Sequence, residues 1–196
     1  MHASGQVIAF DLEWNHPLEA LLQALNAYLP EDVAARQVRA APTGFDPRRH
    51  ARSRKYAYRL FFDPVRDPLR ERYAWRLWPA LCIEPLQQAA SLLVGEHDFA
   101  AFGTPPRAGS STVRSVYQSE WRPEVAGLVY QVTANAFLYH MVRRMVRLQI
   151  AVAQGRMALE TLSDLVHMPQ QGSQTITVQG LAPAQGLFLE EVNYTE

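Results

Sequence analysis

Residues 45–58 concentrate the side chains that could hold a polyanion. They read Phe-Asp-Pro-Arg-Arg-His-Ala-Arg-Ser-Arg-Lys-Tyr-Ala-Tyr, so five are Arg or Lys and Asp46 is the one acid among them. Guanidinium groups bind phosphates through paired hydrogen bonds, and tyrosine rings stack on bases. The segment therefore suits a nucleic acid, although a solvated basic loop leading into a strand gives the same pattern.

A second group of cations recurs at helical spacing. His140, Arg143, Arg144 and Arg147 stand at i, i+3, i+4 and i+7, which is one face of a helix. Like charges on one face repel each other, and a carboxylate or a phosphate would relieve that repulsion. The alternative is an ordinary solvated helix face.

Other kinds of chemistry leave little trace in the sequence. It contains no glycine-rich phosphate loop and no Gly-x-Ser-x-Gly motif, and its six histidines are scattered. Cys82 is the only cysteine, so neither an internal disulfide nor a cysteine metal cluster is predicted. No metal site is expected. Asn135, just before the cationic helix, is read either as a helix cap or as a polar site residue.

Composition places the chain among globular proteins. It has 196 residues, 48% of them hydrophobic, and a formal net charge of zero. A neutral chain is a poor non-specific nucleic-acid binder, so any RNA contact must come from local patches. No apolar run reaches membrane-spanning length, and the low cysteine content favours the reducing cytoplasm.

Periodicity predicts a mixed α+β domain. Alternating apolar residues indicate strands, and apolar residues three and four apart indicate helices. The predicted strands are 4–14, 32–40, 55–62, 73–78, 113–121, 128–133 and 187–192, and the predicted helices are 18–28, 83–93, 138–155 and 158–167. Residues 102–112 read as a loop. Short turns between neighbouring strands favour an antiparallel sheet with helices packed on one face.

Several motifs together resemble the TruA family of tRNA pseudouridine synthases. They occur in the family's order along almost the whole chain, at residues 29–33, 45–58, 95–99, 114–116, 135–143 and 182–189. The most specific is Asn-Ala-Phe-Leu-Tyr-His-Met-Val-Arg at 135–143. Each motif is weak by itself, and their order makes the resemblance specific.

The resemblance implies a fold and a reaction. The fold has two similar α/β halves, whose antiparallel sheets join around a central basic cleft, in a homodimer that binds tRNA. Residues 1–42 would be the remainder of an incomplete N-terminal half, and residues 43–196 the C-terminal half. The reaction is the isomerisation of uridine to pseudouridine at positions 38–40 of the anticodon stem-loop, with the target base flipped out of its stack. It uses no metal and no organic cofactor.

The resemblance also implies roles for individual residues. Tyr56 matches the tyrosine that stacks on the target uracil, and Arg143 matches the arginine that pairs with the catalytic carboxylate. Leu187 lies in the segment that forms an apolar wall of the pocket. The residues expected to contact RNA are Arg48, Arg54, Lys55, Arg144 and Arg147. The family commonly has Asn and Gly in place of Arg144 and Arg147, which indicates either an altered helix contact or a more basic cleft.

The family's nucleophilic aspartate is the main departure. It belongs to a Gly-Arg-Thr-Asp-x-Gly-Val-His-Ala motif, of which His2 and Ala3 match the last two residues. The aspartate would lie three residues before Met1, and Met1 stands where the family has valine. One hypothesis is a start codon assigned too late, since GTG encodes valine and also starts bacterial genes. The other is a truncated, catalytically inactive protein that binds tRNA. Either way, the 196-residue chain as written is predicted to form no pseudouridine.

Overall fold

The computed structural model describes residues 1–167 and 180–194. These residues form two compact units: Met1–Gln6 together with Ala51–Glu196, and Val7–His50. The units are described separately below. The predicted domain boundary after residue 42 stays a prediction.

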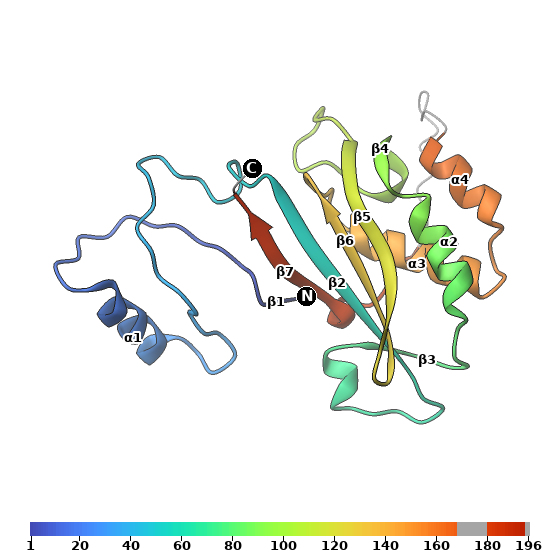
Figure 1. Ribbon diagram of the computed structural model, residues 1–196, viewed down its shortest axis with the longest axis horizontal. Coiled ribbons are helices and arrows are strands. Elements are labelled where there is room, and N and C mark those ends of the chain that lie inside the picture. The colour runs from blue at the N-terminus through green and yellow to red at the C-terminus, as the bar shows by residue number, and fades with distance from the viewer. Residues whose placement is uncertain (168–179, 195–196) are drawn as a thin grey trace. The chain divides into compact units, whose positions relative to one another are not determined.

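The larger unit is an α+β structure, as predicted. Within the described residues its strands are β1 (His2–Ala3), β2 (Ser53–Phe62), β3 (Trp75–Leu77), β4 (Gly95–Asp98), β5 (Val113–Glu124), β6 (Gly127–Ala134) and β7 (Leu187–Asn193). Its helices are α2 (Ile83–Ser91), α3 (Met141–Ala153) and α4 (Leu159–His167) (Figure 1). No helix in the described part of the chain is long and apolar enough to cross a membrane.

These strands form one sheet in the order β1-β7-β2-β6-β5-β4, with β3 pairing with β2 beside this path. The central pairs β7-β2, β2-β6 and β6-β5 are antiparallel, as the short turns predicted. The sheet departs from the expected antiparallel arrangement at two places, because β1 runs parallel to β7 and β3 runs parallel to β2. Connections through long irregular segments allow these parallel pairs, and turn signals do not reveal them.

The core lies between the sheet and helices α2, α3 and α4, which gather on one side of it (Figure 1). Alternate residues of β2 and β6 point into this core, among them Tyr58, Leu60, Tyr130 and Val132. They meet apolar positions of the helices, including Met145 of α3. The period-two and period-3.6 patterns of the sequence therefore mark the two sides of the same core.

The smaller unit, Val7–His50, contains helix α1 (Leu18–Tyr28) in the predicted place. The Asn26 side chain donates to the Ala35 carbonyl at 2.9 Å and accepts from the Ala35 amide at 2.8 Å, so the chain after the helix folds back beside it. In the turn that follows Phe45, the Asp46 carboxylate accepts from the Arg48 and Arg49 amides. These two hydrogen bonds hold the pKa of Asp46 below its usual value.

The predicted strands 4–14 and 32–40 are absent from the structure, and strands β1 and β4 were not predicted. Residues 5–14 and 32–40 have no strand pairing, and more than half of the surface of Ile8, Phe10 and Leu12 is exposed. Alternation indicates a strand only when a neighbouring strand supplies hydrogen bonds along it, and beyond the Gly5 amide, which donates to the Leu189 carbonyl of β7, no strand pairing is described for these residues. The missed strand β4 has the composition Gly-Glu-His-Asp, which is poor in strand formers, and it forms by pairing with β5.

Candidate active site

Tyr56 lies on β2 with its ring half-buried against the core. Its nearest aromatic neighbour is Phe137, with ring centroids 5.0 Å apart and an interplanar angle of 82°. Burial raises the pKa of the Tyr56 hydroxyl, and the nearby positive charge of Arg54 opposes that shift. The phenol is therefore neutral at physiological pH, and its ring forms a fixed apolar surface beside a guanidinium group.

Asn135 joins Arg54 to the neighbouring strand. Its side-chain oxygen accepts from the amides of Ser115 and Ala136 at 3.1 and 2.7 Å, and its backbone carbonyl accepts from Arg54 at 3.2 Å. The interpretation of Asn135 as a helix cap was wrong, because helix α3 begins only at Met141. The side chain instead fixes the path of the chain between β6 and α3.

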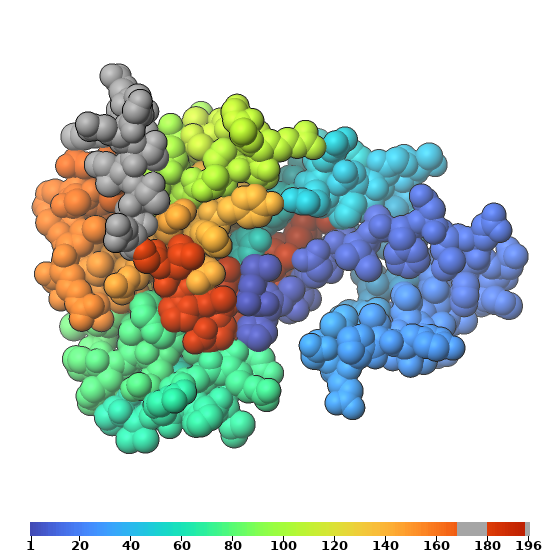
Figure 2. All heavy atoms as spheres, turned by 180° about the vertical axis from the view of Figure 1, so that it is seen from behind, coloured from blue at the N-terminus to red at the C-terminus, as the bar shows by residue number. Residues whose placement is uncertain are grey.

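Arg143, in the first turn of α3, contacts the segment that leads into β7. Its Nε donates to the Ala182 carbonyl at 2.6 Å, and its own carbonyl accepts from the Ala182 amide at 3.2 Å. Figure 2 shows this segment, in red, against the gold residues around the start of α3. No carboxylate among the described residues forms an ion pair with Arg143. Its terminal nitrogens thus remain available to an anion.

Leu187 begins β7 and is almost fully buried beside Tyr58, its partner on β2. The segment before Leu187 packs closely against Tyr58. The Tyr58 hydroxyl donates to the Pro183 carbonyl at 2.7 Å, and a Cβ added at Gly186 would lie 2.7 Å from the Tyr58 ring. The positive charge of Arg143 also acts on Tyr58, although burial raises the Tyr58 pKa more strongly. Tyr58 and Arg143 therefore hold the 182–187 segment at the same side of the sheet.

The start of α3 is clamped by the loop that follows Phe102. Thr104 and Tyr139 exchange backbone hydrogen bonds of 3.3 and 2.9 Å, which keep Tyr139 extended. The helix begins two residues later, so His140 must reverse the chain, and it does so with a positive φ of 66°. Both the Tyr139 and His140 side chains are exposed. This clamp explains why the helix starts later than the predicted residue 138.

The remaining cations of α3 make contacts within the fold. Arg144 donates to the Phe102 carbonyl at 3.2 Å, while its Nε is buried without a hydrogen-bond partner in the described residues. Arg147 is half-buried, and its Nε would lie 3.6 Å from a Cβ added at Gly180. The face is therefore not simply solvated. Arg144 thus contacts the Phe102 backbone, while an altered helix contact relative to the family and contact of either arginine with RNA both stay predictions.

The structure does not place all predicted RNA contacts together. Lys55 precedes Tyr56 on β2, so alternation directs it to the opposite face of the sheet, where its Nζ lies 3.6 Å from Glu190. Arg48 is exposed and belongs to the Val7–His50 unit. Arg54, Tyr56 and Arg143 belong to the other unit.

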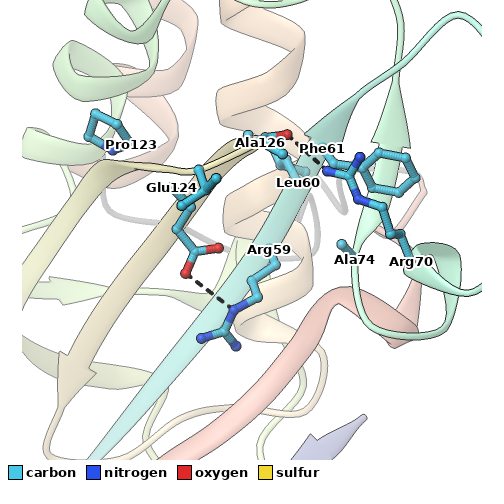
Figure 3. A pocket seen from close by; sticks show the side chains of 10 residues that line it. Arg59, Leu60, Phe61, Arg70, Ala74, Pro123, Glu124 and Ala126 are labelled. Carbon is cyan, nitrogen blue, oxygen red and sulfur yellow. Dashed lines mark hydrogen bonds and ion pairs between the residues drawn. The ribbon is translucent and has the colours of Figure 1, made fainter.

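A cavity of about 550 Å³ lies at the other end of β2, between that strand and the β5–β6 turn (Figure 3). Its two arginines already have partners. Arg59 pairs with Glu124 at 3.4 Å, and Arg70 stacks on Phe61 and donates to the Ala126 carbonyl. None of the predicted site residues lines it, so we do not assign it to the candidate site.

Sequence patterns did not reveal the supports of this site. Phe137 appeared only as part of a motif, and nothing marked Tyr58 as the hydrogen-bond donor to Pro183, 125 residues away. Asn135 was read as a helix cap or a polar site residue, without its link to Arg54. The register of β2 against β6 and β7 brings these groups together. The one local signal was the Asn-Ala-Phe run itself, placed between a strand and a cationic helix.

Comparisons with known proteins find relatives over nearly the whole chain. A family model described as tRNA pseudouridine synthase matches residues 89–195. The tRNA pseudouridine synthase A of Paraburkholderia phymatum is 33% identical over all 196 residues of this chain and 72% of its own length. The protein of that name from Geotalea uraniireducens is 38% identical over 99% of this chain and 78% of its own length. The one from Bacillus subtilis is 31% identical, over 99% and 77% respectively. From the half of the chain matched by the family model and the nearly complete coverage by these relatives, we conclude that the chain belongs to the tRNA pseudouridine synthase family.

Proposed function

We propose that this protein isomerises uridine to pseudouridine in tRNA, at positions 38–40 of the anticodon stem-loop. The shared name of its relatives supports the reaction and its substrate class. The observation that carries the proposal is that Leu187 pairs with Tyr58, two residues along β2 from Tyr56, while Arg143 binds Ala182 in the segment that leads to Leu187. The comparisons do not favour the alternative of an inactive RNA-binding fragment.

The reaction moves one bond and adds no atoms. A carboxylate attacks the flipped nucleotide, and the bond between N1 of uracil and C1′ of ribose breaks. The uracil turns, and its C5 forms a new bond to C1′, while the bond between the carboxylate and the nucleotide breaks and the carboxylate is released unchanged. The C5 proton is then lost to a base or to water, and N1 gains a proton. Product and substrate are isomers, so the chemistry needs no redox partner.

The chain's residues have separate tasks in this proposal. The ring of Tyr56 stacks on the target uracil, for which a neutral phenol held against Phe137 is suited. The terminal nitrogens of Arg143 pair with the attacking carboxylate and hold it in place, because its Nε is already engaged by Ala182. Leu187 supplies apolar surface to the pocket.

The basic side chains would bind the RNA backbone. We propose that Arg48, Arg54, Lys55, Arg144 and Arg147 contribute to tRNA binding through phosphate contacts. Arg54 is the best supported of them, because it stands beside Tyr56 and is oriented by the Asn135 carbonyl. We further propose that the protein acts as a homodimer, which sedimentation or light scattering of the purified protein would test.

The decisive experiment measures tritium release from C5-tritiated uridine in an unmodified tRNA transcript. Two proteins are compared: the 196-residue chain, and a reading frame extended upstream of Met1 to include the family's aspartate motif. We expect release from the extended protein and none from the 196-residue chain, which should still bind the tRNA. Release by the shorter chain would overturn the placement of the nucleophile before Met1. Absence of release from both would contradict the proposed function.

Substitutions at position 56 test the site itself. Tyr56→Ala in the active protein should lower kcat/KM by about 10- to 100-fold, the usual worth of one base–aromatic stack. Tyr56→Phe keeps the ring and should retain most of the stacking. Tyr117→Ala serves as a control, since this tyrosine is 58% exposed on β5 and has no part in the proposed site. Full activity of Tyr56→Ala would remove the stacking role.

A further inference from the structure

Tyr56 lies within β2, paired with Val132 of β6 and Leu189 of β7, and its side chain is half-buried. A ring that stacks on a flipped base must present one plane in one position, since small displacements of a positioning group reduce rates strongly. The structure gives Tyr56 one aromatic neighbour among the described residues, Phe137, whose ring stands nearly perpendicular at 82° and 5.0 Å. Perpendicular ring contacts are directional, unlike general apolar contact.

Phe137 is itself held on both sides along the chain. Two residues before it, the Asn135 side chain accepts two backbone hydrogen bonds, and its backbone amide donates to Ser115 at 3.1 Å. Directly after it, Leu138 is buried in the core, and Tyr139 is paired with Thr104. A ring carried by so constrained a segment is a stiff support. Simple core filling would not require a hydrogen-bonded anchor on each side.

We propose that Phe137 is a positioning residue, which fixes the ring plane of Tyr56 against which the target uracil stacks. This inference rests on the proposed function. Phe137 does not touch the reacting atoms, and it acts on the reaction only through Tyr56. Its removal should therefore affect the chemical step more than the binding of tRNA, which depends mainly on phosphate contacts.

The test is a double-mutant cycle in the pseudouridine-forming protein. Phe137→Leu should lower kcat about 10-fold and leave the Kd for tRNA within about 2-fold, because the phosphate contacts remain. In a Tyr56→Ala background the same change should lower kcat by less than about 2-fold, since the ring that it positions is gone. Equal losses in both backgrounds would overturn the proposal and leave Phe137 a structural residue.

Two further variants separate positioning from stability. Phe137→Tyr keeps a ring at this position and should retain most of the activity. Phe62→Leu is the matched control: Phe62 is also half-buried against the core, at the opposite end of β2. It should lower thermal stability about as much as Phe137→Leu while leaving kcat unchanged. A loss of kcat in Phe62→Leu equal to that in Phe137→Leu would argue against a specific role.

A measurement without turnover keeps the two proposals distinguishable. With 3-fluorotyrosine at position 56, a ring held by Phe137 flips slowly and should give two resolved fluorine resonances. These should merge into one averaged line in Phe137→Leu. Identical spectra in both proteins would overturn the positioning role even if the enzyme is active. If the two resonances merge in Phe137→Leu but the parent protein forms no pseudouridine, the contact between the two rings is established and the proposed function is contradicted.

Discussion

At the scale of single residues, the candidate site depends on arginine side chains that are oriented by hydrogen bonds to backbone carbonyls. The Arg143 Nε donates a hydrogen bond to the Ala182 carbonyl, and this contact orients the rest of the guanidinium group. Arg54 is oriented in the same way by the carbonyl of Asn135. A flexible arginine loses conformational entropy when it binds a phosphate or a carboxylate, and a prior hydrogen bond reduces that loss.

Arg54→Gln should weaken tRNA binding and also reduce its salt dependence. Loss of one phosphate contact lowers the slope of log K against log salt by about 0.7 to 0.9. Filter binding across a salt series measures the slope. Arg66→Gln is the control. Arg66 is exposed, it forms an ion pair of 2.7 Å with Glu71, and it is not part of the candidate site. An unchanged slope in Arg54→Gln would show that Arg54 contacts no phosphate.

His140 is a residue whose backbone conformation suits glycine better. Its φ of 66° lies in the left-handed region, which costs a non-glycine residue about 1 kcal/mol. His140→Gly should therefore keep or raise the free energy of unfolding, by up to about 1 kcal/mol, while a β-branched His140→Val should lower it. Urea denaturation measures both. Equal destabilisation by the two variants would mean that the imidazole, and not the backbone, determines stability there.

At the scale of elements, the site lies where three segments distant in sequence meet. β2 carries Tyr56, the crossing from β6 to α3 carries Phe137 and Arg143, and the approach to β7 carries Leu187. The register of β2 with β7 shifts between Lys55 and Tyr56. Such irregularities re-aim side chains and are frequent beside active sites. Here the shift lies directly beside Tyr56, and β2 stays paired with β7 on both sides of it.

Gly186→Ala should disturb this meeting point. The new Cβ would lie 2.7 Å from the Tyr58 ring and 3.0 Å from the Arg59 carbonyl, and neither neighbour can move freely inside the sheet. We expect a loss of about 1–3 kcal/mol in the free energy of unfolding, typical of overpacking, together with lower activity as Leu187 shifts. Calorimetry and tritium release measure the two effects. Wild-type stability would show that the segment can yield without cost.

At the scale of the whole molecule, the core of the larger unit includes polar groups with matched partners. The Trp121 indole donates to Gln149 at 2.6 Å, and Gln149 donates to the Met145 carbonyl at 3.1 Å. The Tyr130 hydroxyl pairs with Ser119 at 2.7 Å. Buried polar groups without partners are strongly destabilising, so these bonds tie the helix layer to the sheet in one arrangement.

Stability should fall at alkaline pH because buried tyrosines resist ionisation. Burial raises the Tyr130 pKa from its ordinary 10.0 to about 12, and it raises the Tyr58 pKa as well. Above pH 10 the unfolded chain loses these protons while the folded chain keeps them. Each tyrosine then lowers the free energy of unfolding by about 1.4 kcal/mol per pH unit. The stabilisation is complete below pH 10 and is lost as the pH rises toward the folded pKa.

Urea denaturation between pH 9 and pH 11 would measure this slope. Tyr130→Phe should make it shallower by about 1.4 kcal/mol per pH unit, whatever its effect on stability at neutral pH. A slope in Tyr130→Phe equal to that of the parent would contradict burial of this hydroxyl in the folded protein.

The elements with clear periodicity could be predicted from the sequence, because periodicity reflects which face meets the core. Helix α1, the helices of the larger unit and strands β2, β5, β6 and β7 follow from local pattern, and ordered motifs pointed to the family. Residues 5–14 show the limit of pattern: their alternation is strand-like, but a strand exists only when another strand pairs with it.

The sequence by itself therefore determined the residue types of the site, the sides of its helices and strands, and the family. Tertiary structure alone decided that Phe137 stands against Tyr56, that Arg143 binds Ala182, and that Lys55 faces away from both. These relations depend on strand register and on the late start of α3, which are set by hydrogen bonds between segments far apart in the sequence, such as that from the Arg52 amide to the Asn193 carbonyl. Local propensity carries no information about such long-range pairings, since they form only when the whole sheet closes.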